Sequence, residues 1–269
     1  MSPQSSTSDR PVHVQRRGAV ATVTLMRPDA MNALDVATKE ALLLALRQVA
    51  ADGSVRCVVL TGSGRAFSVG EDLREHSALL AEHPDEVWRT VREHYNPIVA
   101  LISAMDKPVI ASLNGIAAGA GASIAFAADL RYLADSAGFT LSFAGVGLSC
   151  DSGASWTLPQ LVGLAKAKEL MMLGGRIGAA EALRLGLATE VVPADDLAAH
   201  VAAVASQLAQ GPTLALGAIR RAVTHAAGSD LASALAFEAD LMDRTGASAD
   251  HAGAVQSFLA KESPTFTGQ

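Results

Sequence analysis

The chain has few of the residues that stabilise disulfide-rich domains or bind metals. Its 269 residues include only two cysteines, Cys57 and Cys150, and neither lies in a spacing typical of metal ligands. So few cysteines in a chain of this length indicate a reduced, cytoplasmic protein. The seven histidines are scattered without an H-x-x-x-H pair, which argues against a metal site.

The chain also lacks strong positive charge and long apolar runs. Its net charge is -6 and it has no basic run, so we expect no nucleic-acid partner. The most apolar stretch, 110–128, is interrupted by Asn114 and several glycines, and no run approaches the ~18 apolar residues that span a bilayer. We therefore expect no membrane partner. The polar segment 1–11 has no apolar stretch of the signal-peptide kind and predicts a disordered tail.

Half of the residues are hydrophobic, and their patterns alternate between strand and helix, which indicates an α/β fold. We expect strands at 12–16, 19–26, 57–61, 109–113 and 130–133, and helices at 34–51 and 87–103. Asp35 is the expected N-cap of the first helix, and Pro97 should kink the second. Segment 75–85 is polar and reads as a loop. The expected core covers 12–195, and a helical lobe covers 196–269.

Two segments rich in small residues, Gly64–Leu73 and Asn114–Ser123, follow apolar runs and lead into helix-like stretches. Such strand-to-helix corners can aim two backbone N–H groups at one point. That is the geometry of an oxyanion hole, which stabilises negative charge on a carbonyl oxygen. Gly119-Ala-Gly121 lacks the third glycine of a dinucleotide-binding turn, so NAD is not expected.

The same segments carry a family resemblance. Ala66–Leu73 resembles the AF-(C/S/A)-(A/S)-G-x-D-L motif of the enoyl-CoA hydratase/isomerase (crotonase) superfamily, and Asn114–Gly121 resembles its NG-x-A-x-GGG helix start. Arg27–Leu34 is similar to its RP-x-x-x-NAL segment, and Phe258–Pro264 to its closing F-x-x-K-x-x-P. The resemblance implies a crotonase-like core of spiralling ββα units with a C-terminal helical lobe that packs into a homotrimer or homohexamer. It also implies an acyl-CoA thioester substrate and no cofactor other than the coenzyme A of that substrate.

By the same resemblance, the amides of Glu71 and Ala120 are the expected oxyanion donors. Ala120 stands where the family usually has the middle glycine, but it keeps the N–H group. The implied substrate-binding residues lie in the first three motifs, in the segment before Gly147 and in the terminal helix. They are Arg27, Ala30, Arg65, Ala66, Ser68, Asp72, Leu73, Phe143, Phe258 and Lys261.

The chain departs from the family's hydratases at both of their catalytic glutamates, which are Ser123 and Phe143 here. One carboxylate, Asp151, lies in Gly147–Trp156, a segment that resembles isomerases including those of phenylacetyl-CoA breakdown. We therefore expect Asp151 to shuttle a proton while a thioester enolate sits in the oxyanion hole. A pocket of apolar side chains should raise the pKa of Asp151. The expected lining is Phe143, Val146, Leu148 and Trp156.

Four alternatives remain open at this point. Asp151 could be only the N-cap of the helix that follows. Glu71 could serve as a second acid or base and allow hydratase activity. Dehalogenation through an aspartyl intermediate is another alternative. It would need a histidine base at the position of Asn96, and the nearest histidine, His94, is two positions away. The chain could also be a CoA-ester binding protein that has lost catalysis.

Overall fold

The protein is described by a computed structural model that covers residues 10–269. The tail expected at 1–11 lies almost entirely outside the described residues and stays a prediction. Within 10–269, every helix is too short or too polar to cross a membrane.

A six-stranded sheet forms the base of the fold, in the order β1-β2-β3-β5-β7-β10. Its strands are β1 (Val12–Arg17), β2 (Val20–Leu25), β3 (Cys57–Gly62), β5 (Val109–Leu113), β7 (Leu130–Ala134) and β10 (Glu190–Val192). The first two are antiparallel and turn at Gly18, whereas the others pair in parallel. The five strands expected from the sequence are confirmed. β3 and β5 are buried along almost their whole length, because helix α8 (Leu197–Gln210) and the short strand β4 (Ala66–Ser68) both pack against them.

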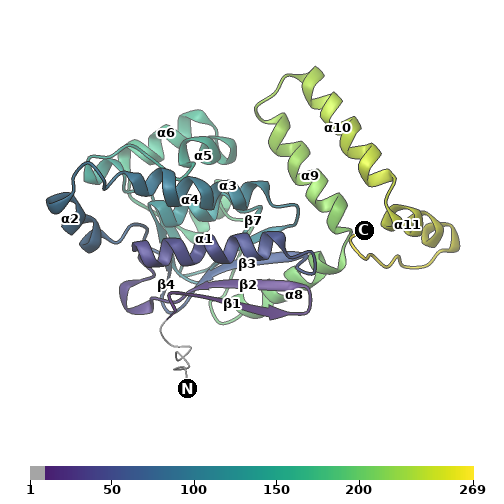
Figure 1. Ribbon diagram of the computed structural model, residues 1–269, viewed down its shortest axis with the longest axis horizontal. Helices are drawn as coiled ribbons and strands as arrows, with labels where there is room; N and C mark the ends of the chain where they lie inside the picture. The colour runs from purple at the N-terminus through teal and green to yellow at the C-terminus, as the bar shows by residue number, and fades with distance from the viewer. Residues whose placement is uncertain (1–9) are drawn as a thin grey trace.

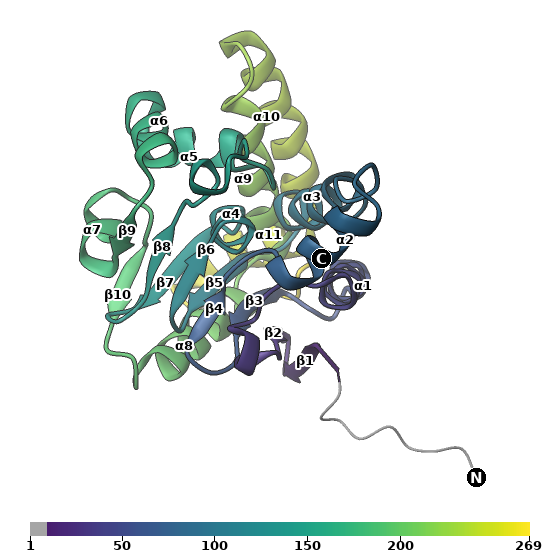
Figure 2. The same cartoon turned by 90° about the vertical axis from the view of Figure 1, so that its left-hand side faces the viewer.

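A second sheet of four short strands lies next to the first, in the order β4-β6-β8-β9 (Figure 2). Its strands are β4 (Ala66–Ser68), β6 (Ile116–Ala118), β8 (Gly138–Thr140) and β9 (Arg176–Gly178). β4, β6 and β8 pair in parallel, and each follows a strand of the large sheet in the chain. The carboxyl ends of β4, β6 and β8 therefore meet at one edge, where the chain leaves the sheet three times.

The helices begin where the sequence provides a cap. Helix α1 (Val36–Ala51) starts at Asp35, whose Oδ1 accepts from the Thr38 amide at 2.8 Å, as expected. Segment 75–85 is not a loop but mostly helix α2 (Leu73–Glu82), because Asp72 caps it by accepting from the amides of Arg74 and Glu75. The expected helix at 87–103 is found as a π-helical turn, Val91–Tyr95, that runs into α3 (Asn96–Ala104).

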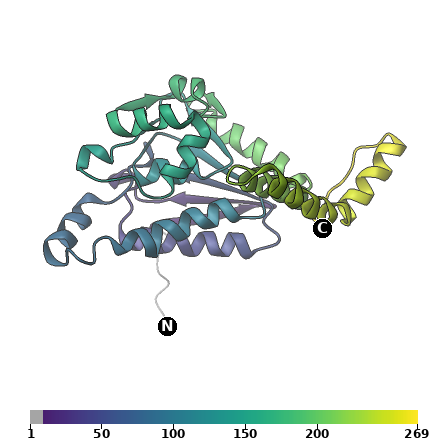
Figure 3. The same ribbon diagram turned by 90° about the horizontal axis from the view of Figure 1, so that it is seen from above.

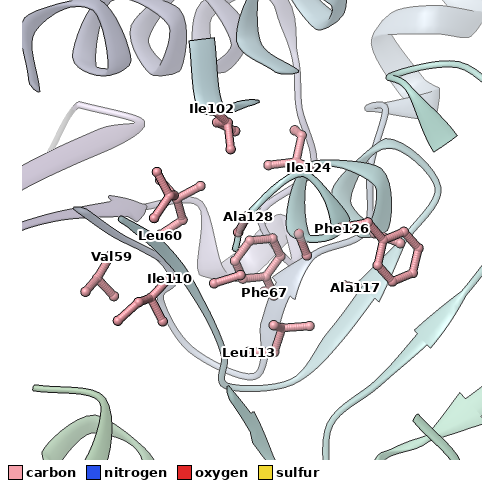
Figure 4. Packing of buried hydrophobic residues seen from close by; sticks show 14 of the residues in the cluster. Val59, Leu60, Phe67, Ile102, Ile110, Leu113, Ala117, Ile124, Phe126 and Ala128 are labelled. Atoms are coloured by element: carbon pink, nitrogen blue, oxygen red, sulfur yellow. The ribbon is translucent and has the colours of Figure 1, made fainter. Parts of the chain in front are cut away.

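The remaining helices follow the second corner. They are α4 (Ala120–Phe126), α5 (Ala154–Val162), α6 (Leu164–Leu173), α7 (Ala179–Arg184), α8 (Leu197–Gln210), α9 (Thr213–Ala226), α10 (Leu231–Gly246) and α11 (Ala249–Ala260). Figure 4 shows how the core between these layers is filled: Ile102 of α3, Ile124 of α4 and Leu60 of β3 lie around Phe67 of β4. This packing fixes the two corners that follow β4 and β6.

The C-terminal lobe is smaller than expected. Helix α8 packs on β3, β5 and β7, so it covers the large sheet and belongs to the core. Only α9, α10 and α11 project away from it (Figures 1 and 3). The lobe therefore begins after α8 rather than at Asp196. Its helices expose large apolar side chains, among them Leu231, Leu235, Met242, Phe258 and Leu259.

Candidate active site

The two corners predicted from the sequence lie against each other. The chain turns at Gly70 (φ 83°) after β4 and at Gly119 (φ 50°) after β6, both in the left-handed region that favours glycine. A Cβ atom on Gly70 would lie 3.1 Å from the Ala120 nitrogen and 2.8 Å from the Ala118 oxygen. Because the pairing of β4 with β6 puts these turns at the same edge, the Glu71 and Ala120 amides are brought close together.

Both amides are free to bind a ligand. Leu34 donates to the Gly70 carbonyl at 2.8 Å and accepts from the Asp72 amide at 3.2 Å, which pins the chain on either side of Glu71. Within residues 10–269, neither the Glu71 nor the Ala120 N–H donates to a protein acceptor. Two such donors in a fixed position can polarise a carbonyl oxygen and stabilise it as it becomes negative.

The side chain of Glu71 is fixed by two residues that the sequence analysis did not single out. Lys39 of α1 places its Nζ 2.9 Å from Oε1 and 3.1 Å from Oε2, and the Tyr95 hydroxyl donates to Oε2. The side chains of Lys39 and Tyr95 are almost fully buried. Lys39 could have been found from its spacing, because it shares the apolar stripe of α1 with Leu42 and Leu46.

Asp151 lies at the end of the segment that leaves β8, the third parallel strand of the small sheet. Its Oδ1 accepts from the Ser152 hydroxyl at 2.8 Å. Ser152 is buried with φ 51°, and Gly153, not Asp151, is the N-cap of α5, where no side chain caps the helix. The alternative that Asp151 serves as a helix N-cap is therefore wrong.

Burial raises the pKa of Asp151, and the negative charge of Glu71 raises it further. The Ser152 hydrogen bond and the positive charge of Lys39 oppose this shift but do not cancel it. Burial also raises the pKa of the Tyr95 hydroxyl, followed by the charges of Glu71 and Asp151. Glu71, Tyr95 and Asp151 therefore form one electrostatic neighbourhood beside the two free amides.

The apolar lining expected around Asp151 is found only in part. Phe143 is buried, but Val146, Leu148 and Trp156 are 56%, 38% and 45% exposed. Trp156 lines a separate hollow together with Phe126. The two positions that match the hydratase glutamates hold no carboxylate: Phe143 is one, and at the other Ser123 is fully buried and donates to the Gly119 carbonyl at 3.1 Å.

Arg27 does not project a free charge toward a ligand. Its guanidinium lies 2.9 Å from Asp72 Oδ2 and 3.1 Å from Asp35 Oδ2, and it donates to the Ala33 carbonyl at 2.6 Å. These contacts tie the start of α1 to the start of α2. Within this chain Arg27 therefore has a structural role, with Asp72 as one of its partners, and its expected contact with substrate stays a prediction.

The other residues expected to bind substrate lie in different places. Ala66 and Ser68 are buried in β4, and the Ser68 hydroxyl donates to the Asn32 carbonyl at 2.8 Å, so these side chains serve the corner itself. Ala30 ends a short 3-10 turn, Pro28–Ala30, whereas Arg65 and Leu73 are exposed beside the first corner.

The terminal helix does not reach the corner within one chain. Phe258 lies in α11 and Lys261 just past its end, both exposed. Figure 1 shows α11 at the opposite end of the molecule from α2. A contact between these residues and a substrate would have to come from another copy of the chain.

Free backbone amides near a partly buried carboxylate are an arrangement that can stabilise negative charge on a carbonyl oxygen. The comparisons with known proteins identify the family. A profile of the family described as enoyl-CoA hydratase/isomerase matches residues 15–269, and the chain belongs to that family.

Relatives of known name match over nearly their whole length. A protein of Rhodobacter capsulatus named as a probable enoyl-CoA hydratase is 42% identical over 93% of this chain and 95% of its own. The 1,2-epoxyphenylacetyl-CoA isomerase of Escherichia coli K12 is 38% identical over 96% and 97%. A crystal structure from Mycobacterium abscessus, of a protein assigned as an enoyl-CoA hydratase/isomerase, superimposes with a TM-score of 0.92 at 40% identity and covers 96% of this chain and 100% of its own. The expected crotonase-like fold is thereby confirmed.

Proposed function

We propose that the protein is an enoyl-CoA isomerase that moves a double bond through a thioester enolate, with Asp151 as the proton shuttle. One observation carries this proposal. Glu71, which carries one of the free amides, is paired with Lys39, whereas Asp151, which lies within electrostatic reach of Glu71 and Tyr95, accepts a side-chain hydrogen bond within residues 10–269 from the Ser152 hydroxyl alone. A single available base suits a reaction that removes a proton at one carbon and returns it at another.

The proposed reaction begins when the thioester oxygen of a 3-enoyl-CoA accepts hydrogen bonds from the Glu71 and Ala120 amides. The Asp151 carboxylate removes a proton from C2, and the C–H electron pair moves into the enolate so that negative charge develops on the thioester oxygen. The two amides stabilise that charge. Asp151, now protonated, returns the proton at C4, and the double bond comes to lie between C2 and C3. The net change is a shift of one proton and one double bond.

The raised pKa of Asp151 supports both halves of this cycle. A carboxyl group with an ordinary pKa is a weak base and, once protonated, loses its proton to water easily. Burial makes ionised Asp151 a stronger base and prolongs its protonated form. Such a group is better matched to transfer at neutral pH in both directions.

Hydratase activity is the second candidate. It is favoured by the name of the Rhodobacter capsulatus relative and by the electrostatic contact between Glu71 and Asp151. Two neighbouring carboxylates can add water to a double bond, because one activates the water molecule and the other protonates the second carbon. Its weakness is that Lys39 and Tyr95 both engage the Glu71 carboxylate.

Under either activity, we propose that the substrate is an acyl-CoA thioester and that the protein needs no cofactor. We also propose that the projecting lobe assembles a homotrimer or homohexamer in the cytoplasm.

The test is to incubate the purified protein with a 3-enoyl-CoA and with a 2-enoyl-CoA in deuterated water and to identify the products by mass spectrometry. Deuterium exchange or a shifted double bond without the added mass of water is the expected result. Addition of water would establish the hydratase alternative instead. Tight binding without any conversion would indicate a CoA-ester binding protein and overturn the proposal.

A further inference from the structure

The contacts of Glu71 form a cluster whose arrangement has a function of its own. Lys39 comes from α1, Glu71 from the first corner, and Tyr95 from the π-helical turn before α3, so three separate segments converge on one carboxylate. Both partners of Glu71 are 1% exposed, whereas Glu71 itself is 19% exposed at its side chain. The Lys39 ammonium also lies 5.4 Å from the centre of the Tyr95 ring.

Stability alone does not account for this cluster. Removing a lysine and a glutamate from water costs several kcal/mol per ion, and their attraction offsets this cost only when the geometry is good and further hydrogen bonds are made. Such a pair contributes little net stability compared with apolar side chains of the same volume, but it fixes the geometry of the atoms that it joins.

The π-helical turn gives a second, independent reason to look here. The extra residue of a π-helix turns the following side chains relative to an ordinary helix, and such turns are rare and concentrated at functional sites. In this chain the turn ends at Tyr95 itself, and Pro97, which has no N–H to donate, lies two residues further on, in the first turn of α3. The local distortion therefore coincides with the residue whose hydroxyl reaches Glu71.

We propose that Lys39 and Tyr95 are positioning residues of the active site: by engaging both oxygens of the Glu71 carboxylate they fix the Glu71 amide as an oxyanion donor and keep that carboxylate from acting as a second base. The backbone around Glu71 is already pinned by its hydrogen bonds to Leu34. Anchoring the far end of the side chain leaves the residue no freedom to rotate its N–H away from the substrate. The inference rests on the proposed function, because it assigns a role within that same site.

The cluster can be tested with a probe that reports on the thioester carbonyl rather than on turnover. A 2-enoyl-CoA labelled with ¹³C at the carbonyl is bound to the Asp151→Asn protein, and its C=O stretch is recorded by isotope-edited infrared spectroscopy. Two strong donors lower this frequency. Adding Tyr95→Phe or Lys39→Met should move it back toward the value of the free thioester.

The same substitutions in the otherwise unchanged protein should lower kcat much more than they raise KM. A displaced donor costs roughly 10- to 100-fold in rate, and we expect the smaller loss for Tyr95→Phe and the larger for Lys39→Met. If Lys39→Met prevents folding by leaving Glu71 unpaired, the double variant Lys39→Met/Glu71→Gln removes both charges and carries the same test.

Matched controls separate positioning from packing. Tyr132→Phe removes the hydroxyl of another buried tyrosine, in β7, and Lys107→Met removes another buried ammonium, which binds the carbonyls of Val49 and Asp52. Both should leave kcat and the carbonyl frequency unchanged, whatever they do to the melting temperature.

Two failures can be told apart. If the cluster variants shift neither kcat nor the carbonyl frequency, Lys39 and Tyr95 are packing residues and the inference is overturned. If the labelled thioester binds with a lowered frequency that depends on the cluster, but no double bond moves, the inference stands and the proposed isomerase function fails.

Discussion

Glu71 and Asp151 are both carboxylates beside the same pair of amides, yet their surroundings differ. Glu71 accepts from a buried lysine and a buried tyrosine at a corner that is held on both sides by Leu34. Asp151 accepts from a neighbouring hydroxyl and ends a segment that is mostly exposed. Glu71 forms an ion pair with Lys39, whereas Asp151 is partly buried and forms no ion pair within residues 10–269.

This difference in surroundings suits the two residues to different roles: Glu71 to binding the thioester oxygen through its amide, and Asp151 to proton transfer. Both oxygens of the Glu71 carboxylate already accept hydrogen bonds from buried donors, so this group is held in place rather than presented to a substrate proton. A desolvated carboxylate without a cation gains basicity instead. Environment, rather than residue type, therefore assigns the two roles.

The difference in role between Glu71 and Asp151 is tested most directly by neutralising each carboxylate in turn. Asp151→Asn should lower kcat by about 10² to 10⁴-fold, the usual contribution of a general acid–base group. Glu71→Gln should cost less, at most the roughly 10- to 100-fold expected when the Lys39 contact is lost, because the amide oxygen can still accept from Tyr95 and the backbone donor is kept. Steady-state kinetics with a 3-enoyl-CoA measure both. Equal losses for the two variants would mean that the carboxylates act as a pair.

The corner itself is tested by Gly70→Ala. The added Cβ would press on the Ala118 oxygen and the Ala120 nitrogen, in a backbone conformation that alanine rarely adopts. We expect about a 10²-fold loss of kcat, comparable to the loss of one oxyanion donor. Gly18→Ala is the matched control, because Gly18 also has a positive φ but open space around it. Kinetic losses of similar size in both variants would assign the effect to backbone strain alone.

The unpaired state of Asp151 predicts the pH dependence. Asp151 must be ionised to remove a proton, so kcat/KM should fall as the pH drops through its raised pKa, at a higher pH than for an ordinary aspartate. Ser152→Ala removes the hydrogen bond that lowers this pKa and should move the acidic limb to still higher pH. Profiles of kcat/KM for both proteins measure the shift, and a limb that does not move would remove Ser152 from this role.

The smallest expected effect concerns stability. A carboxyl group whose pKa is raised on folding destabilises the folded state wherever it is ionised. Asp151→Asn should therefore give a small rise in melting temperature at neutral pH. The gain should disappear as the pH falls through the folded-state pKa toward 3.8, the ordinary value for aspartate. Thermal unfolding at several pH values measures this, and a lower melting temperature at neutral pH would contradict it.

Local patterns predicted the long elements of this fold. The apolar runs of β3 and β5 and the Asp35 cap of α1 are each specified by a few neighbouring residues. Strands β4 and β6 were missed because each has three residues and gains its hydrogen bonds only by pairing with the other. α2 was predicted to be a loop because its composition is polar, although the cap at Asp72 was visible in the sequence.

The residues of the candidate site likewise fall into those specified by neighbouring residues and those brought together by packing between distant segments. The two corners and Asp151 could be located because short motifs carry them. The contact of Glu71 with Tyr95 could not, because Tyr95 lies 24 positions further along the chain and is brought back by the packing of α3. The pairing of Arg27 with Asp35 and Asp72 likewise depends on how α1 and α2 start side by side.

The oxyanion donors are main-chain groups, and this has a consequence for how the chemistry of the site can be altered. Every residue except proline supplies a backbone N–H, so the two amides that stabilise the enolate tolerate a change of side chain. Proton transfer depends instead on the side chains at a few positions, and these can be exchanged. A library that varies 123, 143 and 151 together, while the glycine corners and Glu71 are kept, would search for new reactions on a scaffold whose charge-stabilising element is retained. Restoring glutamate at Ser123 and Phe143 is the first design to make.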